Sequence, residues 1–164
     1  MVSVPGGPTL VGKHVLLGVT GSIACYKAVS LLRALVREGA QVDVAMTQAA
    51  AKFVTPLTFE VLSGRHVAMD LFKAHQEMKH LTLPERADVM VVAPATANFL
   101  AKAALGLADD VLTTMLLAAA CPVIVAPAMD GGMWTHPAVV EHVQALRRRG
   151  VTVLDPEEGS LASG

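Results

Sequence analysis

Charged side chains are scarce in this sequence. Only 16% of its 164 residues are charged and 53% are hydrophobic, whereas soluble domains carry about 25% charged residues. The length fits one domain with one core. A domain of this size cannot bury that much apolar surface by itself, so we expect copies of the chain to pack against one another.

Cysteine is scarce too. Cys25 and Cys121 both lie in apolar stretches and form no CxxC pair, which excludes a zinc site or a disulfide framework of the usual spacing. We predict no metal site, and reduced thiols favour a cytoplasmic location.

Long basic runs and long uninterrupted apolar runs are also missing. The net charge is −1, and the one basic triplet, Arg147–Arg149, ends a predicted helix, where cations suit the negative end of the dipole. The apolar segment Val111–Pro127 is broken by Thr113, Thr114 and Pro122. We therefore predict neither nucleic-acid binding nor a membrane span.

The domain organisation follows from the two ends of the chain. Residues 1–10 are rich in proline and glycine and lack the features of a signal peptide. We expect them to form a flexible tail, followed by a single domain over residues 11–164.

Short apolar runs alternate with helical patterns along that domain. The predicted strands are His14–Val19, Gln41–Met46, Asp88–Ala93, Pro122–Ala126 and Val151–Leu154. The first predicted helix carries Val29 and Leu32 and stops at Gly39, and a second starts in Thr47–Lys52. The other predicted helices are Pro56–Leu62, Thr96–Leu105, Asp110–Ala120 and Pro137–Arg149. This order predicts an α/β fold: a doubly wound, mostly parallel sheet with helices on both faces, a Rossmann-like or flavodoxin-like three-layer sandwich. Such folds bind ligands at the carboxyl ends of their strands.

The first strand leads into Thr20-Gly21-Ser22-Ile23 and then into a helix. Free backbone N–H groups at a helix start favour a phosphate, although a plain tight turn would use the same residues. The segment matches neither G-x-G-x-x-G nor the P-loop pattern. Because the second strand ends in Met46-Thr47, without an acid to hold a ribose, a mononucleotide fits better than NAD.

Two later strands are followed by similar segments. After the third strand come Ala93–Asn98, where small residues would let a ligand approach and Thr96 and Asn98 supply polar groups. Thr96 is equally suited to start a helix. After the fourth strand, Asp130 precedes two glycines, which is ordinary turn chemistry.

His80 precedes Leu81-Thr82-Leu83, shortly before the third strand. Histidine is suited to proton transfer near neutral pH. A structural or exposed role is the alternative for a lone histidine, and the other five have no evident site around them.

These segments, taken in order, resemble the flavin-dependent cysteine decarboxylase family, most of all its members that act on phosphopantothenoylcysteine. The resemblance covers nearly the whole chain after Val11. The matching segments are Gly18–Ala24, Met46-Thr47, Phe53–Pro56, His80–Leu83, Ala93–Asn98, Gly106–Asp110, Ala126–Asp130 and Gly159–Gly164.

The resemblance implies FMN as the cofactor. Its phosphate would lie at Gly21, Ser22 and Ile23. The rest of the flavin would be surrounded by Thr47, Phe53, Thr96, Ala97, Asn98, Ala128 and Met129. His80 matches the family's catalytic histidine, Ser163 occupies the position of its catalytic cysteine, and Asp130 and Ala162 would bind substrate.

The implied reaction is decarboxylation of 4'-phosphopantothenoylcysteine to 4'-phosphopantetheine in coenzyme A biosynthesis. The substrate's cysteine part loses two electrons, CO2 leaves from the thioaldehyde-like intermediate, and the resulting enethiol is reduced again. The family forms trimers, often grouped into dodecamers, and its bacterial members are often fused to a synthetase domain.

Two residues depart from the family pattern. Asp130 stands where Asn is usual, and an ionised carboxylate there would repel a substrate carboxylate. Ser163 stands where Cys is usual, and a hydroxyl is a much weaker acid than a thiol. Alternatives are therefore an oxidative peptidyl-cysteine decarboxylase or a non-catalytic FMN-binding regulatory subunit. A flavin prenyltransferase agrees less well with His80 and Ala126–Asp130. We expect the chain to be truncated within the substrate flap, because Gly164 falls inside that motif.

Overall fold

The computed structural model describes residues 7–71 and 79–156. Its sheet has five strands in the order β2-β1-β3-β4-β5, and every pairing is parallel. The strands are β1 His14–Val19, β2 Gln41–Met46, β3 Val89–Ala95, β4 Val123–Pro127 and β5 Thr152–Val153. The predicted doubly wound sheet is confirmed, and each predicted strand lies within two residues of its observed bounds.

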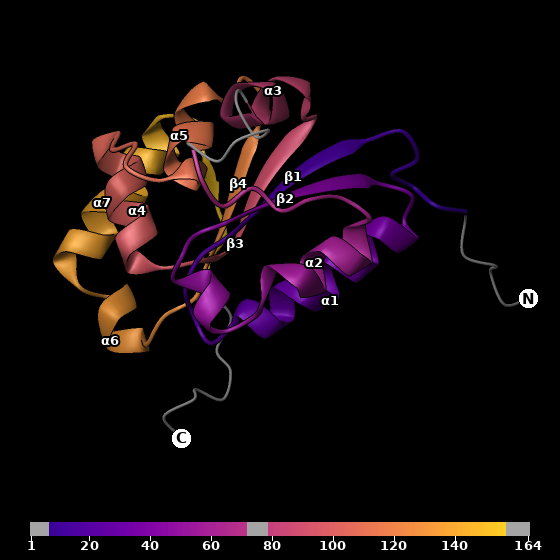
Figure 1. Cartoon of the computed structure of the whole chain (residues 1–164). Helices are drawn as coiled ribbons and strands as arrows, with labels where there is room; N and C mark the ends of the chain where they lie inside the picture. The colour runs from indigo at the N-terminus through magenta and orange to yellow at the C-terminus, as the bar shows by residue number, and fades with distance from the viewer. Residues whose placement is uncertain (1–6, 72–78, 157–164) are drawn as a thin grey trace, which may run out of the picture.

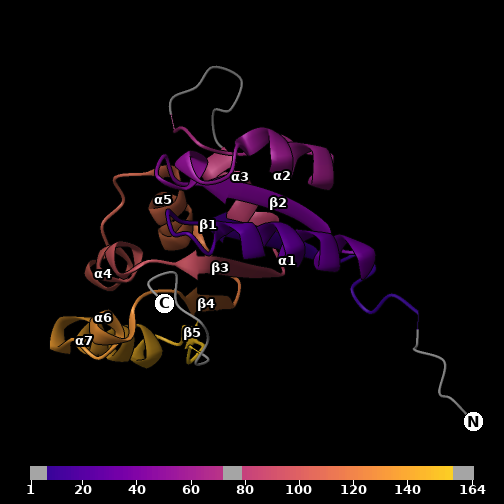
Figure 2. The same cartoon turned by 90° about the horizontal axis from the view of Figure 1, so that it is seen from below.

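Helices cover both faces of this sheet, as Figures 1 and 2 show. The helices are α1 Cys25–Arg37, α2 Pro56–Ser63, α3 Lys79–Arg86, α4 Ala97–Leu105, α5 Val111–Ala118, α6 Gly131–Trp134 and α7 Pro137–Arg148. Two buried clusters make the core: one joins α1 and α2 to the sheet, and the other joins α3, α4, α5 and α7 to it.

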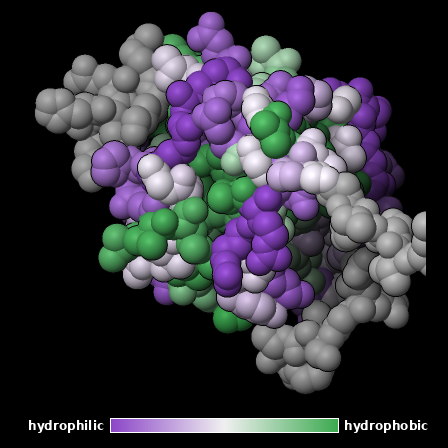
Figure 3. Space-filling view, turned by 90° about the vertical axis from the view of Figure 1, so that its right-hand side faces the viewer, coloured by the Kyte–Doolittle hydropathy of each residue, from purple (hydrophilic) through white to green (hydrophobic). Residues whose placement is uncertain are grey.

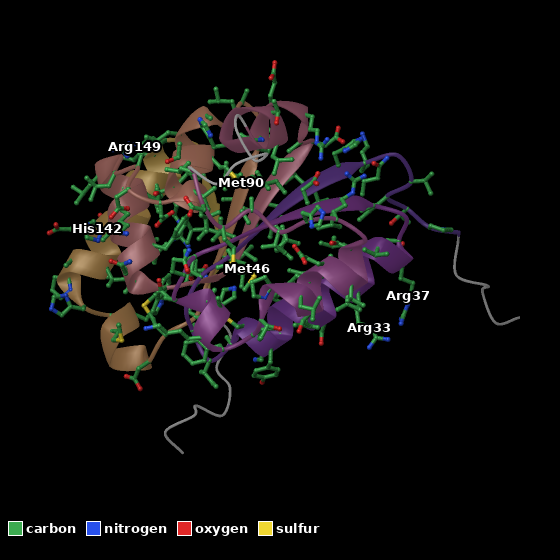
Figure 4. All side chains as sticks on the ribbon, in the orientation of Figure 1. Arg33, Arg37, Met46, Met90, His142 and Arg149 are labelled. Carbon is green, nitrogen blue, oxygen red and sulfur yellow. The ribbon has the colours of Figure 1, made fainter. Side chains whose placement is uncertain are left out.

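The strands are apolar on both sides because both sides are covered. In β1, Leu16 belongs to the cluster beneath α4 and α5, whereas Leu17 belongs to the cluster beneath α1. This is the alternation expected of a strand whose successive side chains point to opposite faces. Figure 4 shows Met46 and Met90 in the interior, with Arg33 and Arg37 on the outer side of α1.

Three local predictions differ from the structure. The helix predicted from Thr47 is only a short 3-10 turn, Ala50–Lys52, because the extended Thr55 before Pro56 does not continue a helix. Helix α3 was not predicted, since Pro84 lies inside it; burial of Leu83 in the core outweighs that local cost. Asp130 does not lead into a simple turn but caps the short helix α6.

Apolar side chains also remain on the surface. Leu57 and Val61, one turn apart on α2, are 64% and 72% exposed, and hydrophobic patches interrupt the hydrophilic surface on the face drawn in Figure 3. Within the described ranges, no helix combines the length and the apolar character needed to cross a membrane.

Candidate functional site

The candidate site lies at the carboxyl edge of the sheet, where β1, β2, β3 and β4 end in loops. Backbone hydrogen bonds join these loops in pairs. The Thr47 N–H donates to the Val19 carbonyl at 3.1 Å, and the Ala128 N–H donates to the Ala95 carbonyl at 3.0 Å. The four segments that the sequence predicts around a ligand therefore meet along one edge, as parallel strands require.

The loop after β1 leaves hydrogen-bond donors free. Within the described part of the chain, neither the Gly21 N–H nor the Ile23 N–H donates to an acceptor. Both lie in the loop just before α1, which begins at Cys25 and whose dipole favours an anion at this end. The Ser22 hydroxyl accepts the Ala24 N–H at 3.2 Å. This geometry supports the predicted phosphate site.

Gly21 is the position where this loop touches the loop after β2. A Cβ built on Gly21 would lie 2.4 Å from the Ala49 Cβ, so a side chain there would push the two loops apart. The Thr47 hydroxyl accepts the Ala50 N–H at 3.2 Å and shapes the second loop. Ile23 and Phe53 leave 58% and 51% of their surfaces exposed, which provides apolar surface of the kind that planar aromatic ligands cover.

The loop after β3 is fixed by two threonines. The Thr96 hydroxyl accepts the Phe99 N–H at 3.2 Å and so caps α4. The Thr96 N–H in turn donates to the Thr20 hydroxyl at 3.0 Å. Ala97 packs on the core, and Asn98 is exposed in the first turn of α4.

The loop after β4 continues the same edge. Ala128 and Met129 are half-buried, and Asp130 is exposed. The Asp130 carboxylate accepts the Gly132 N–H at 2.8 Å and caps α6. Its negative charge is thereby held beside the predicted ligand position.

Cys25 lies directly beneath the first loop. Its thiol is fully buried and donates to the Thr20 carbonyl at 3.0 Å. Burial raises the pKa of the Cys25 thiol. The group therefore stays protonated near neutral pH, which makes it a packing residue and not a nucleophile.

His80 lies in the first turn of α3, and its Nδ1 atom is buried with no hydrogen-bond partner in the described part of the chain. A buried polar atom without a partner is uncommon and is often found at functional sites. However, no hydrogen bond among the described residues joins His80 to the four loops, and α3 lies apart from α6 in Figures 1 and 2. The predicted site residues Ala162 and Ser163 lie outside the described residues.

Free N–H donors and small residues at the carboxyl edge of a parallel sheet are typical of nucleotide-binding α/β proteins. The chain belongs to the Flavoprotein family, whose model matches residues 7–163. The resemblance to flavin-dependent cysteine decarboxylases stated from the sequence is confirmed.

Individual relatives agree with this family. The coenzyme A biosynthesis bifunctional protein CoaBC of Mycobacterium bovis is 50% identical over 149 residues, which cover 91% of this chain and 36% of that protein. The chain thus spans little more than a third of that relative.

Solved structures resemble the chain over most of their length. The FMN-dependent cysteine decarboxylase SpaF has a TM-score of 0.86 and 39% identity, covering 92% of this chain and 88% of SpaF. A C175S mutant of PPC decarboxylase, in complex with pantothenoylaminoethenethiol, has a TM-score of 0.80 and 33% identity, covering 93% of this chain and 86% of that one.

Proposed function

We propose that this chain is an FMN-dependent decarboxylase that converts 4'-phosphopantothenoylcysteine to 4'-phosphopantetheine and CO2 in coenzyme A biosynthesis. The observation that carries the proposal is the joined loop edge with free donors at Gly21 and Ile23, in a chain similar to PPC decarboxylase and to SpaF along most of their lengths.

The residues at this edge fit FMN. The free N–H groups of Gly21 and Ile23 suit a dianionic phosphate, and exposed Ile23 and Phe53 offer apolar surface to a ring system. Gly21, Ser22 and Ile23 would hold the phosphate. The remaining flavin contacts are assigned to Thr47, Phe53, Thr96, Ala97, Asn98, Ala128 and Met129.

When bound, FMN would accept two electrons from the cysteine part of the substrate and return them after CO2 has left, so the overall reaction is redox-neutral. The chain's own residues orient the substrate and move protons. His80 is assigned the proton transfer, because its ring has a buried nitrogen without a partner and histidine suits this role near neutral pH.

The residue type at position 163 favours one specific alternative. Ser163 offers a hydroxyl where the family's reductive step uses a thiol, so the reaction would stop at the enethiol if serine cannot supply the proton. The chain would then be an oxidative cysteine decarboxylase, and an external oxidant such as O2 would have to remove the two electrons left on the flavin before the next turnover. The product distinguishes the two: the thiol 4'-phosphopantetheine is two hydrogens heavier than the enethiol.

A second copy of the chain completes the proposed site. In one copy, α3 with His80 lies apart from α6 (Figures 1 and 2), and the exposed apolar residues Leu57 and Val61 of α2 are available for contact between copies. We assign the chain to a homotrimer or a trimer-based dodecamer with FMN near subunit contacts. A fused synthetase domain in the full-length protein and a cytoplasmic location belong to the same proposal.

The test has two stages. The purified protein is examined for a flavin absorption spectrum and for FMN released on denaturation, and it is then given phosphopantothenoylcysteine while CO2 and product mass are recorded. A flavin spectrum with 4'-phosphopantetheine as product supports the proposal. A flavin spectrum without CO2 release supports the regulatory-subunit alternative, and a protein that takes up no FMN contradicts both.

The shared site has its own test. His80→Gln and Gly21→Val variants are each expected to be inactive, because one removes the proton-transfer group and the other disrupts the phosphate loop. If two copies build each site, mixed assemblies of the two variants regain part of the activity. Mixtures that stay inactive, although native mass spectrometry shows mixed assemblies, contradict the shared site.

A further inference from the structure

Thr20, the residue directly after β1, is one of the few buried polar residues of the described chain, with 2% of its surface exposed. Its hydroxyl donates to the Pro94 carbonyl at 2.7 Å and accepts the Thr96 N–H at 3.0 Å. Its own N–H also donates to the Pro94 carbonyl, at 3.3 Å. These three hydrogen bonds are called the Thr20 latch below.

The latch joins two loops at the point where the strand ladder stops. The pairing of β1 with β3 ends at Gly18 and Val92, and both strands continue beyond this pair towards the candidate site. Past that point, Thr20 bonds the end of β3 at Pro94 and the loop after β3 at Thr96. Because Thr96 is also bonded to α4 through its hydroxyl, its position is fixed from both sides.

The Thr20 hydroxyl is not a ligand-binding group. A hydroxyl has one proton to donate, and the proton of Thr20 is used by the Pro94 carbonyl. The side chain is buried and contacts protein on both sides. Its effect on a ligand is therefore exerted through the loops that it holds.

We propose that Thr20 is a positioning residue that fixes the phosphate loop, Gly21–Ile23, relative to the Thr96–Asn98 loop before the cofactor binds. This inference rests on the proposed function, because it takes FMN as the ligand of both loops. Loops that are already ordered lose little conformational entropy on binding, which strengthens binding without any added contact.

The sharpest variant is Thr20→Val, which keeps the shape of the side chain and removes the hydroxyl. The Pro94 carbonyl retains the Thr20 N–H as a donor, while the Thr96 N–H loses its acceptor. Thr20→Ser is the conservative variant, because it keeps the hydroxyl and removes only the methyl group. Thr113→Val is the matched control, because Thr113 is equally buried and its hydroxyl serves the cap of α5 instead.

The experiment measures the Kd for FMN by fluorescence quenching, the melting temperature, and amide hydrogen exchange of the cofactor-free protein. We expect Thr20→Val to weaken FMN binding by about tenfold or more, because it removes one buried hydrogen bond and the loss of such a bond costs about this much. We expect Thr20→Ser to stay close to the wild type. In Thr20→Val, the peptide that contains Thr96 should exchange faster, whereas Thr113→Val should melt earlier with its FMN affinity retained.

Three outcomes overturn the proposal. One is a Thr20→Val variant with the FMN affinity of the wild type, and another is an equal loss of affinity in Thr113→Val, which would reveal a general effect of stability. The third is unchanged exchange at Thr96 in Thr20→Val, and this result overturns the latch even if the wild-type chain binds no FMN. Absence of FMN binding in the wild type is, by contrast, the failure of the proposed function itself.

Discussion

In the amino-terminal halves of the strands, called the amino edge below, charged side chains bond one another and the backbone, whereas the carboxyl edge leaves donors free. The Asp88 carboxylate accepts the His14 N–H at 2.8 Å, and Asp43 pairs with Arg86 at 2.6 Å and Arg65 at 3.5 Å. At the carboxyl edge, the N–H groups of Gly21 and Ile23 have no acceptor in the described chain.

This difference separates stability from function within one sheet. Polar groups satisfied by the protein hold strands and helices together, while unsatisfied ones are available to a ligand. The amino edge has one exception, the buried Nδ1 of His14, which has no partner among the described residues. Substitutions at the amino edge should therefore change stability, and those at the carboxyl edge should change binding or turnover.

The largest expected effect follows from His80→Gln. Removing the proposed proton-transfer group should lower kcat by about a hundredfold or more, with FMN binding and melting temperature nearly unchanged. Measurements of CO2 release and flavin absorbance check this. His142→Gln, on the surface of α7 (Figure 4), is the matched control and should keep full activity. An active His80→Gln enzyme would remove His80 from the mechanism.

Asp43→Ala tests the amino edge. Asp43 is almost buried and pairs with two arginines, so its loss leaves Arg65 and Arg86 without their carboxylate. Since both arginines reach solvent, we expect the free energy of unfolding to fall by about 1–2 kcal/mol, with the Kd for FMN unchanged. Urea denaturation measures the first quantity. Asp155→Ala, which breaks an exposed pair with Arg147, is the control. A large loss of FMN affinity in Asp43→Ala would contradict the assignment of stability to the amino edge and of binding to the carboxyl edge.

Asp130→Asn is expected to act on substrate binding alone. Asparagine caps a helix as well as aspartate does, so α6 should keep its cap on Gly132. If the substrate carboxylate lies beside Asp130 as proposed, removing the negative charge should lower KM by about threefold to tenfold. Steady-state kinetics provide the measurement. A rise in KM would show that the carboxylate itself contributes to substrate binding.

The smallest effect concerns pH. The bond from the His14 N–H, followed by the charge of Lys13, lowers the pKa of Asp88 below its ordinary value of 3.8. Its contribution to stability is therefore complete above that value and is lost as the pH falls through the lower pKa of the folded state. Asp88→Asn should weaken the dependence of melting temperature on pH below about pH 4. An unchanged slope in that range would contradict this assignment.

Much of the fold could be predicted because each strand carries its own signal. His14–Val19 and Gln41–Met46 are strands with the predicted bounds, since continuous apolar runs of this length are typical of a doubly covered sheet. Helix α3 could not be predicted, because its local sequence contains Pro84 and its stability comes from contacts with distant segments, such as the burial of Leu83 and the pair of Arg86 with Asp43.

The sequence named candidate site residues one by one but not their arrangement in space. The sequence indicated a phosphate at Gly21–Ile23 and a polar loop at Thr96, and the structure brings these loops together. From the sequence alone, Thr20 was assigned no role. A threonine beside a glycine turn does not indicate which distant residues its hydroxyl bonds, and Pro94 and Thr96 lie far away along the chain.

By itself, the sequence determined the succession of strands and helices, the apolar strands of a covered sheet, and the chemical character of each loop, because these depend on local pattern and composition. Only the tertiary structure decided which loops touch, that Thr20 joins two of them, and that α3 with His80 lies apart from α6 in a single copy. The reason is that strand order and long-range hydrogen bonds depend on packing between distant segments, which no local pattern specifies.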